Sequence, residues 1–274
     1  MKRSFIFFIT VMMLTLCLTT CNNNEAEPQL GTTNINGALP GKFSVSEGRQ
    51  VYFSKGNLWY SDVKKHWRFS PEQYNLSVPS SMEANKYIFH FGWGTGNNPT
   101  NQSTDINDYQ EFVDWGVNPI LDSGEQPNLW RTLTADEWKY LISSRLNAKE
   151  LCGYAQVNRT NGLILLPDDW KLPSDVSFNP TAKSFTYNKI DNYNWKKMEE
   201  AGAVFLPVVG RRWGEDIFHV NEELNYWAST ASEKAPNCGS CLTASKNSSN
   251  KTTKGISALT YPYGISVRLV TDVK

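Results

Sequence analysis

The sequence predicts an α+β domain in which two short helices pack on small twisted antiparallel sheets, joined by long loops. Two observations predict this class: short aromatic strands separated by turns recur along the chain, and a clear helix start lies near its middle. Aromatic residues make up 13% of the 274 residues, with 10 Trp, which favours a loop-rich domain pinned by large rings over a helix bundle.

Short strands are expected on both sides of the middle of the chain. Residues 51–53 and 57–60 flank a Lys-Gly turn, and 67–69 follow. Residues 151–157 and 163–166 are expected to form a hairpin around Asn161-Gly162, because Asn-Gly is a favoured two-residue turn. The continuous apolar run 163–166 predicts a central, buried strand.

Two helices are expected. Thr134 and Glu137 form a capping-box pattern, and Trp138 follows at helical spacing, so we expect a helix over 135–144 with Trp138 in the core. A second helix is expected over 194–201, ended by Gly202.

The last third is expected to consist of strands and polar loops. Residues 204–206 and 226–230 predict strands, and the Ser-, Asn-, Lys- and Thr-rich residues 232–255 predict a loop. Residues 265–269 predict a final strand with one face inward: Ile265, Val267 and Leu269 alternate with Ser266 and Arg268.

The Gly-, Pro- and Asn-rich residues 92–128 predict a long loop, and such loops in compact domains are usually functional. Asp105, Asn107 and Asp108 could offer oxygens to a structural calcium ion, but a solvated loop explains them as well, and we prefer it. Glu125-Gln126-Pro127-Asn128 is interpreted as an ordinary turn.

The charge balance disfavours nucleic acid as a partner. Lys+Arg and Asp+Glu are both 27, so the formal net charge is zero, whereas phosphate neutralisation needs clustered basic residues.

The amino terminus predicts export. A basic start precedes a short apolar stretch, which indicates a signal peptide over residues 1–20. Leu18-Thr19-Thr20-Cys21 resembles a bacterial lipobox, which implies lipidation of Cys21, a flexible tether over 21–41, and a domain over 42–274. We therefore expect an outer-membrane lipoprotein that faces the surface or the periplasm, with ordinary secretion as the alternative.

Three cysteines follow the predicted signal peptide and lipidation site, and they cannot all pair within one chain. Cys238 and Cys241 could close a small ring, or either could reach Cys152. A zinc site would need a second pair of ligands, and a redox motif would need a βαβ context; the sequence offers neither. We therefore prefer a disulfide that closes the loop, or free thiols.

Five segments in order resemble a known family. The segment Trp130 to Trp138 (WRTLTADEW) is similar to one in C-type-lectin-like bacterial domains, which include the formylglycine-generating-enzyme-like group and the Fibrobacter succinogenes major paralogous domain. Four later segments resemble the latter domain, at residues 162–170, 202–207, 226–230 and 263–270. The resemblance covers about residues 42–272. It implies a C-type-lectin-like fold with paired first and last strands and ligand-binding loops over 92–128, 210–224 and 231–257.

The resemblance and the absence of a catalytic set predict a surface ligand-binding or adhesion module rather than an enzyme, with a glycan or a protein as its ligand and no cofactor. Alternatives are a structural part of a surface appendage or envelope assembly, and a cysteine-dependent oxidase. Aromatic and cationic side chains suit both kinds of ligand. The candidate contacts are Trp93, Arg211, Arg212, Trp213, His219 and Tyr226.

Overall fold

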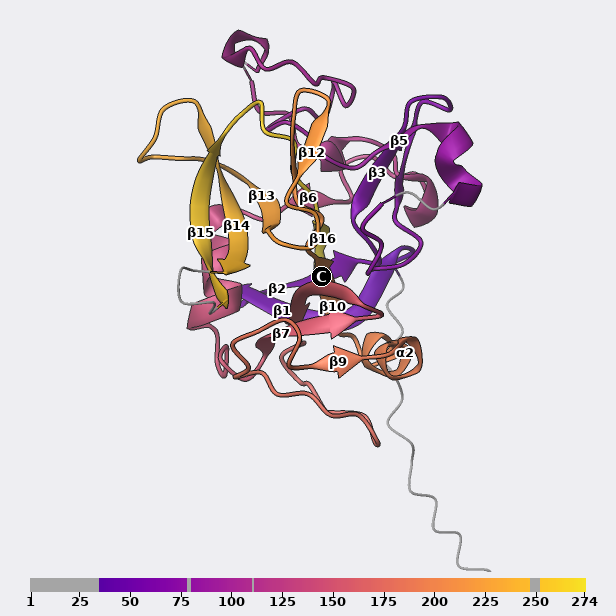
Figure 1. Cartoon of the computed structure of the whole chain (residues 1–274), viewed down its shortest axis with the longest axis vertical. Coiled ribbons are helices and arrows are strands. Elements are labelled where there is room, and N and C mark those ends of the chain that lie inside the picture. Colours follow the sequence, from indigo (N-terminus) through magenta and orange to yellow (C-terminus); the bar gives the residue numbers. More distant parts are fainter. Residues whose placement is uncertain (1–34, 78–79, 110, 247–251) are drawn as a thin grey trace, which may run out of the picture.

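The computed structural model describes residues 35–77, 80–109, 111–246 and 252–274 (Figure 1). The predicted signal peptide, the lipidation site Cys21 and most of the tether lie outside the described residues. Strand β1 (Ala38–Ser46) begins inside the predicted tether, so the ordered domain starts earlier than residue 42. The molecule is built from small, mostly antiparallel sheets and two short α-helices, as the α+β prediction requires.

The first sheet joins both ends of the described chain. Its order is β1-β2-β16-β6, with β2 (Arg49–Ser54), β16 (Leu269–Asp272) and β6 (Arg131–Thr132). Val270 lies opposite Phe53, so the C-terminal strand pairs with β2 rather than with the first strand. The expected pairing of residues 51–53 with the end of the chain is confirmed, and β16 is held on its other side by β6.

The second sheet has the order β10-β8-β7-β9, and its bounds are β7 (Cys152–Val157), β8 (Thr160–Leu165), β9 (Lys189–Ile190) and β10 (Val204–Pro207). β8 is central and buried, as predicted. The turn, however, lies at Asn158 and Arg159, which have φ values of 46° and 70°, and not at Asn161-Gly162. Gly162 lies within β8 instead. A glycine is needed there because the ring of Phe205 packs where a Cβ would lie.

Both predicted helices are present. Helix α1 (Ala135–Lys139) continues through a π-helical turn, η5 (Tyr140–Ser144). The capping box forms as expected: the Glu137 N–H donates to Thr134 Oγ1 (3.1 Å) and the Thr134 N–H donates to Glu137 Oε2 (2.8 Å). Trp138 is fully buried. Helix α2 (Asn192–Glu200) starts two residues earlier than predicted because Asp191 caps it.

Three further sheets form much of the upper part of the molecule in Figure 1. One has the order β4-β3-β5, one is the hairpin β11-β12, and one has the order β13-β14-β15. Their bounds are β3 (Leu58–Ser61), β4 (His66–Phe69), β5 (Tyr87–Ile88), β11 (Arg211–Trp213), β12 (Asp216–Phe218), β13 (Leu224–Ala231), β14 (Cys238–Lys246) and β15 (Thr252–Thr260). The short helices η1 (Ser80–Asn85), η2 (Ile106–Asp108), η3 (Trp115–Val117) and η4 (Leu121–Ser123) lie in the connections.

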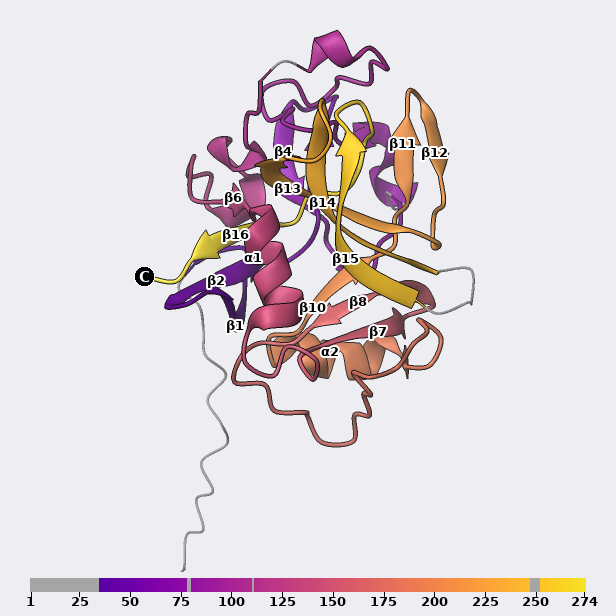
Figure 2. The same cartoon turned by 90° about the vertical axis from the view of Figure 1, so that its left-hand side faces the viewer.

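The prediction of a loop over 232–255 is wrong. Most of this segment forms the β14–β15 hairpin, in which Leu242 and Ala244 are buried. Small polar residues occupy many of the remaining positions, and they mask the alternation of a strand. Figure 2 shows α1 lying along the sheet that these strands form with β13.

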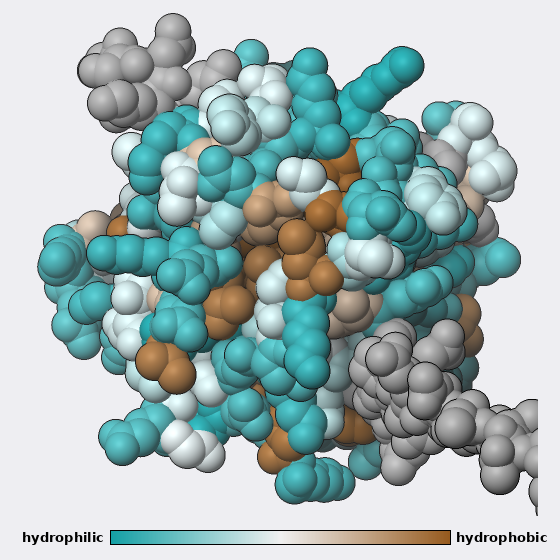
Figure 3. All heavy atoms as spheres, turned by 90° about the horizontal axis from the view of Figure 1, so that it is seen from below, coloured by the Kyte–Doolittle hydropathy of each residue, from teal (hydrophilic) through white to brown (hydrophobic). Residues whose placement is uncertain are grey.

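The core consists of three apolar clusters. The first surrounds Trp138 between the first two sheets and β13, the second is rich in aromatic rings around Trp115, and the third lies under α2 around Trp195. Figure 3 views the side of α2 and residues 171–188, where apolar residues lie at the centre of the face among polar ones.

The expected outward face of the last segment is also wrong, because Ser266 and Arg268 are both buried. Arg268 Nη2 donates to Gln73 Oε1 (2.5 Å), and Gln73 Nε2 donates to Glu199 Oε1 (2.6 Å). Burial lowers the pKa of Arg268 to about 10, with Tyr226 and Glu199 opposing the shift. A buried cation is therefore held by a relay through one amide rather than by a direct ion pair.

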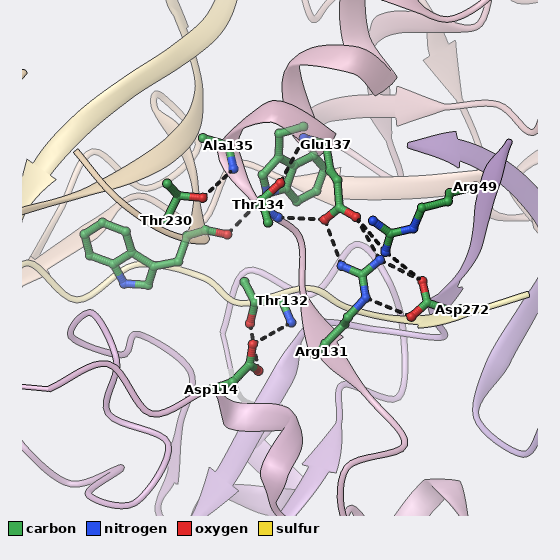
Figure 4. Close-up of polar contacts among 11 residues, drawn as sticks. Arg49, Asp114, Arg131, Thr132, Thr134, Ala135, Glu137, Thr230 and Asp272 are labelled. Atoms are coloured by element: carbon green, nitrogen blue, oxygen red, sulfur yellow. Dashed lines mark hydrogen bonds and ion pairs between the residues drawn. The ribbon is translucent and has the colours of Figure 1, made fainter. Parts of the chain in front are cut away.

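An ion-pair cluster fastens the chain end to the helix start (Figure 4). Arg131 binds both carboxylate oxygens of Glu137 (2.8 and 2.9 Å) and both of Asp272 (3.1 and 2.8 Å), while Arg49 lies 3.4 Å from Glu137. The hydrogen bond from Arg131 lowers the pKa of Asp272. Bidentate guanidinium–carboxylate contacts fix geometry as well as charge, so the cluster sets the position of β16 relative to α1.

Candidate functional site

A half-open cleft of about 360 Å³ lies between the β3–β4 hairpin and the long loop 92–128. The hairpin contributes Tyr60, Lys65, His66 and Trp67 to its wall, and the loop contributes polar side chains. Ligand sites are commonly concave and of about 300–1,000 Å³, lined by rings and a few convergent polar groups. The cleft is therefore the first candidate site.

The hairpin positions the rings by strand pairing. Tyr60 lies opposite Trp67, and Ser61 lies opposite His66. Directly opposite side chains share a face of the pair, and the Tyr60 and Trp67 ring centroids are 4.9 Å apart. The reversal between the strands places Lys65 at φ 54° and lets its N–H donate to the Ser61 carbonyl (2.8 Å). The rings are thus held by backbone geometry rather than by the ligand.

The loop wall is anchored to the same strands. Ile120 forms a parallel bridge with Trp67. Asn118 Nδ2 donates to the carbonyls of Gly96 (2.8 Å) and Trp115 (3.1 Å). These bonds fix the amide orientation, and in the described part of the chain its Oδ1 atom accepts no bond. Asn118 lines the cleft, so the loop wall carries an amide that backbone carbonyls hold in place.

The titratable groups of the cleft are Lys65, His66 and Glu125. Lys65 is paired with Asp62 (2.6 Å), whereas Glu125 takes part in no ion pair among the described residues. Burial lowers the pKa of His66, and Arg68 and Lys64 add to this effect, whereas Asp122 and Glu125 oppose it. The cleft combines ring faces, amides and a carboxylate, which can stack on and hydrogen-bond a polar ligand.

The predicted contacts Arg211 and Trp213 lie together on one face of the β11–β12 hairpin. The Trp213 ring is 4.7 Å from that of Tyr263, and the Arg211 guanidinium lies over the same Tyr263 ring at 5.1 Å. Trp213 is 37% exposed. His219 follows the hairpin, is exposed, and contacts Glu222 (3.1 Å). This hairpin face is a second candidate surface, and Tyr263 is a member that sequence reasoning missed.

The other three predicted contacts are buried, which corrects their assignment to a surface. Arg212 donates to the carbonyl of Gly214 (2.6 Å) and lies within 3.4 Å of those of His90 and Asn101. Tyr226 is fully buried and donates from its hydroxyl to the Pro207 carbonyl (3.1 Å).

Trp93, the third, is also buried. It stacks on Tyr261 at 4.5 Å and donates from Nε1 to the Ala228 carbonyl (2.9 Å). All three residues therefore hold the framework beneath the loops instead of facing a ligand.

The three cysteines of the described residues, Cys152, Cys238 and Cys241, are free and buried. Cys238 and Cys241 are three residues apart on β14, which separates their Cα atoms by about 10 Å in a strand, beyond the reach of a disulfide. Cys152 belongs to a different sheet. Burial raises the pKa of the Cys241 thiol to about 12. The proposed disulfide that closes the loop is wrong because the segment is a strand, and the free-thiol alternative agrees with the structure.

One of the three candidate calcium ligands, Asp105, is engaged with the backbone. Asp105 Oδ1 caps η2 by accepting from the Asn107 N–H (2.9 Å), and Asn107 Nδ2 donates to the same oxygen (2.8 Å). Within the described ranges, no group of three or more His, Cys, Asp or Glu residues is placed to hold a metal ion.

Sequence reasoning missed the cleft. Tyr60 and Trp67 were assigned only to strands, and Glu125 only to a turn. The turn was correct, since Glu125 has φ 56°, but its position opposite the β3–β4 hairpin depends on a contact that no local pattern encodes. The signal that was available is the density of aromatic and polar residues in both segments.

No described helix is long and apolar enough to cross a membrane. Comparison with protein-family models, with curated proteins and with solved structures finds no match for this chain.

Proposed function

We propose that this chain is a ligand-binding module, carried on a lipid anchor at the outer membrane, with a C-type-lectin-like fold, and that its ligand is a glycan bound in the cleft. The fold proposal is supported by the sheet that joins both chain ends, the two helices, and the further small sheets with their long connections. The anchor proposal is supported by the lipobox-like residues before Cys21.

The observation that carries the glycan proposal is the convergence of rings with hydrogen-bonding groups in one half-open space. Tyr60 and His66 supply partly exposed ring surface beside the buried Trp67, and Asn97, Asn118 and Glu125 supply polar atoms. Sugars present apolar C–H faces together with hydroxyl groups, so they need this combination. Lys65 and Glu125 bring one positive and one negative charge to the cleft, so these charges balance, which favours an uncharged sugar.

The proposal is tested with the purified full chain on a glycan array, followed by titration calorimetry with the best ligand. Glu125→Gln and Asn97→Ala alter exposed cleft residues, so both variants should fold and should weaken binding about tenfold when combined, the loss of two hydrogen bonds. Trp213→Leu is the control outside the cleft and should bind as the natural chain does. Absence of any glycan ligand, or loss of binding only in Trp213→Leu, contradicts the cleft assignment.

A second candidate function is protein contact within a surface assembly, favoured by the hairpin face of Arg211, Trp213 and Tyr263. Phe218, directly opposite Arg211, is 44% exposed. Exposed aromatic and Arg side chains are enriched at protein interfaces. Association of the purified chain that Trp213→Leu abolishes, measured by analytical ultracentrifugation, is the expected result for this function.

The buried thiols do not favour the cysteine-dependent oxidase. If that activity existed, substituting Cys238 and Cys241 by Ser would abolish turnover.

A further inference from the structure

A second concave surface lies on another part of the molecule, between helix α1 and strand β15. This groove has a volume of about 660 Å³. One wall is a single helix face, with Ala135, Lys139 and Ile142 at helical spacing, and the other is the five-residue run 254–258 of β15. Residues 230–235, from the end of β13 into its connection with β14, and Ser240 of β14 complete the lining. Figure 2 shows the helix and the strand side by side.

β15 is an edge strand with a free side. It pairs only with β14, in the order β13-β14-β15. Backbone groups of successive strand residues point to opposite sides, so alternate residues face away from β14. The Thr252 N–H donates to the Lys183 carbonyl (3.0 Å), and the Thr260 carbonyl accepts from the Tyr263 N–H (3.0 Å). The even-numbered residues of β15 therefore face outward.

The outward backbone groups of Lys254, Ile256 and Ala258 have no backbone partner within the described ranges. The Lys183 carbonyl, at a bend of the loop 171–188, already occupies the outward N–H at the start of this edge. Long edges of this kind are usually blocked by charges, prolines or bulges. β15 has nine residues, a regular register with β14, no proline, and Lys254 as its one charged side chain.

The charged side chains differ between the two ends of the groove. Asp136 lies at the helix start, where the Ala135 N–H donates to Thr230 Oγ1 (3.1 Å), and Glu233 and Lys234 line the same end. Lys254 lies at the opposite end, with Nζ 5.4 Å from the Tyr154 ring centroid, and Lys139 lies between. None of these five groups takes part in an ion pair within the described part of the chain.

We propose that this groove is a peptide-binding site, at which an extended segment of a partner protein adds to β15 as a fourth, antiparallel strand. An antiparallel strand begins beside Ala258 and Asp136 and ends beside Lys254. The matching peptide therefore carries a basic residue near its N-terminal end and an acidic residue near its C-terminal end. Main-chain hydrogen bonds to the edge provide affinity, and the small residues of the groove leave room for alternate apolar side chains.

The test uses the full chain and two blocked heptapeptides of opposite polarity, Lys-Val-Thr-Val-Thr-Val-Glu and Glu-Val-Thr-Val-Thr-Val-Lys. We expect the first to bind at least fivefold more tightly in a fluorescence titration. By NMR hydrogen exchange it should slow the amides of Lys254, Ile256 and Ala258 about tenfold and leave those of Gly255 and Ser257 unchanged. The latter already face β14.

Two variants separate the peptide site from a loss of fold. Reversing the charges with Asp136→Lys, Lys139→Glu and Lys254→Glu should reverse the preference between the peptides, and Lys171→Glu, outside the groove, should not. Ala258→Pro removes one outward N–H without removing a β14 bond and should weaken binding about tenfold.

Equal binding of both peptides, an unchanged preference after charge reversal, or unprotected edge amides overturns the proposal. So does a dimer of the chain in which these amides are protected without peptide. None of these readouts depends on the glycan cleft.

Discussion

Because His90 is buried, the free energy of unfolding should decrease at acidic pH. The ring is 3% exposed, and its Nε2 atom lies 3.1 Å from the Val209 carbonyl. Burial lowers its pKa from 6.5 to about 4, and the nearby Arg212 acts in the same direction, although the contact with Val209 opposes the shift. No carboxylate partner of this ring is present among the described residues, so protonation in the folded state is opposed by desolvation.

The direction of this pH dependence follows from the difference between the pKa of His90 in the folded chain and in the unfolded chain. In the unfolded chain the histidine takes up a proton as the pH falls through about 6.5, whereas in the folded chain it does so only near pH 4. Stability is therefore complete above pH 6.5, falls between pH 6.5 and 4, and levels off below. The full loss from this one group is about 3 kcal/mol, from about 1.4 kcal/mol for each pH unit of difference.

The assay is urea unfolding followed by tryptophan fluorescence at intervals from pH 8 to pH 4. His90→Gln keeps a donor toward Val209 but does not titrate, so its stability should fall by about 3 kcal/mol less than that of the natural chain across this range. His66→Gln, at a partly buried site, should remove a smaller part of the dependence. Identical pH profiles for His90→Gln and the natural chain, or an NMR titration of His90 near pH 6.5, would refute the reasoning.

Three further outcomes are expected. Thr134→Ala should lower the free energy of unfolding by about 1 kcal/mol in urea titration, because the Glu137 N–H loses its capping partner. A change below about 0.5 kcal/mol, the lower limit for such caps, would contradict this role. Gln73→Leu should destabilise by about 3 kcal/mol because Arg268 stays buried without its shortest hydrogen bond and keeps only the long contacts with Asn57 Oδ1 (3.4 Å) and the Phe205 carbonyl (3.5 Å). The double variant with Arg268→Met should recover most of the loss, and simple additivity of the two single losses would disprove the relay. Cys241 should resist alkylation by iodoacetamide in the folded chain and react after unfolding, as followed by mass spectrometry, since burial raises its pKa to about 12; rapid labelling of the native chain would contradict the buried position.

Part of the fold and little of the site were predictable from the sequence. Thr134, Glu137 and Trp138 determine a helix start within five residues, and the apolar run 163–166 requires burial wherever it lies. Such features depend on neighbouring residues or on total hydrophobicity, and both are present in the sequence itself. The local pattern Arg211-Arg212-Trp213 identified a surface only in part, since Arg211 and Trp213 are at least partly exposed whereas Arg212 is buried.

Tertiary structure decided the features that depend on distant partners. Arg268 is inside because Gln73, 195 residues away, accepts a hydrogen bond from it, and Tyr226 is inside because Asn57, 169 residues away, donates to its hydroxyl. The β14–β15 hairpin is ordered by burial of small residues against α1, and the cleft exists because Ile120 pairs with Trp67. In each case the favourable contact exists only after the chain has closed, so no local pattern of residues records it.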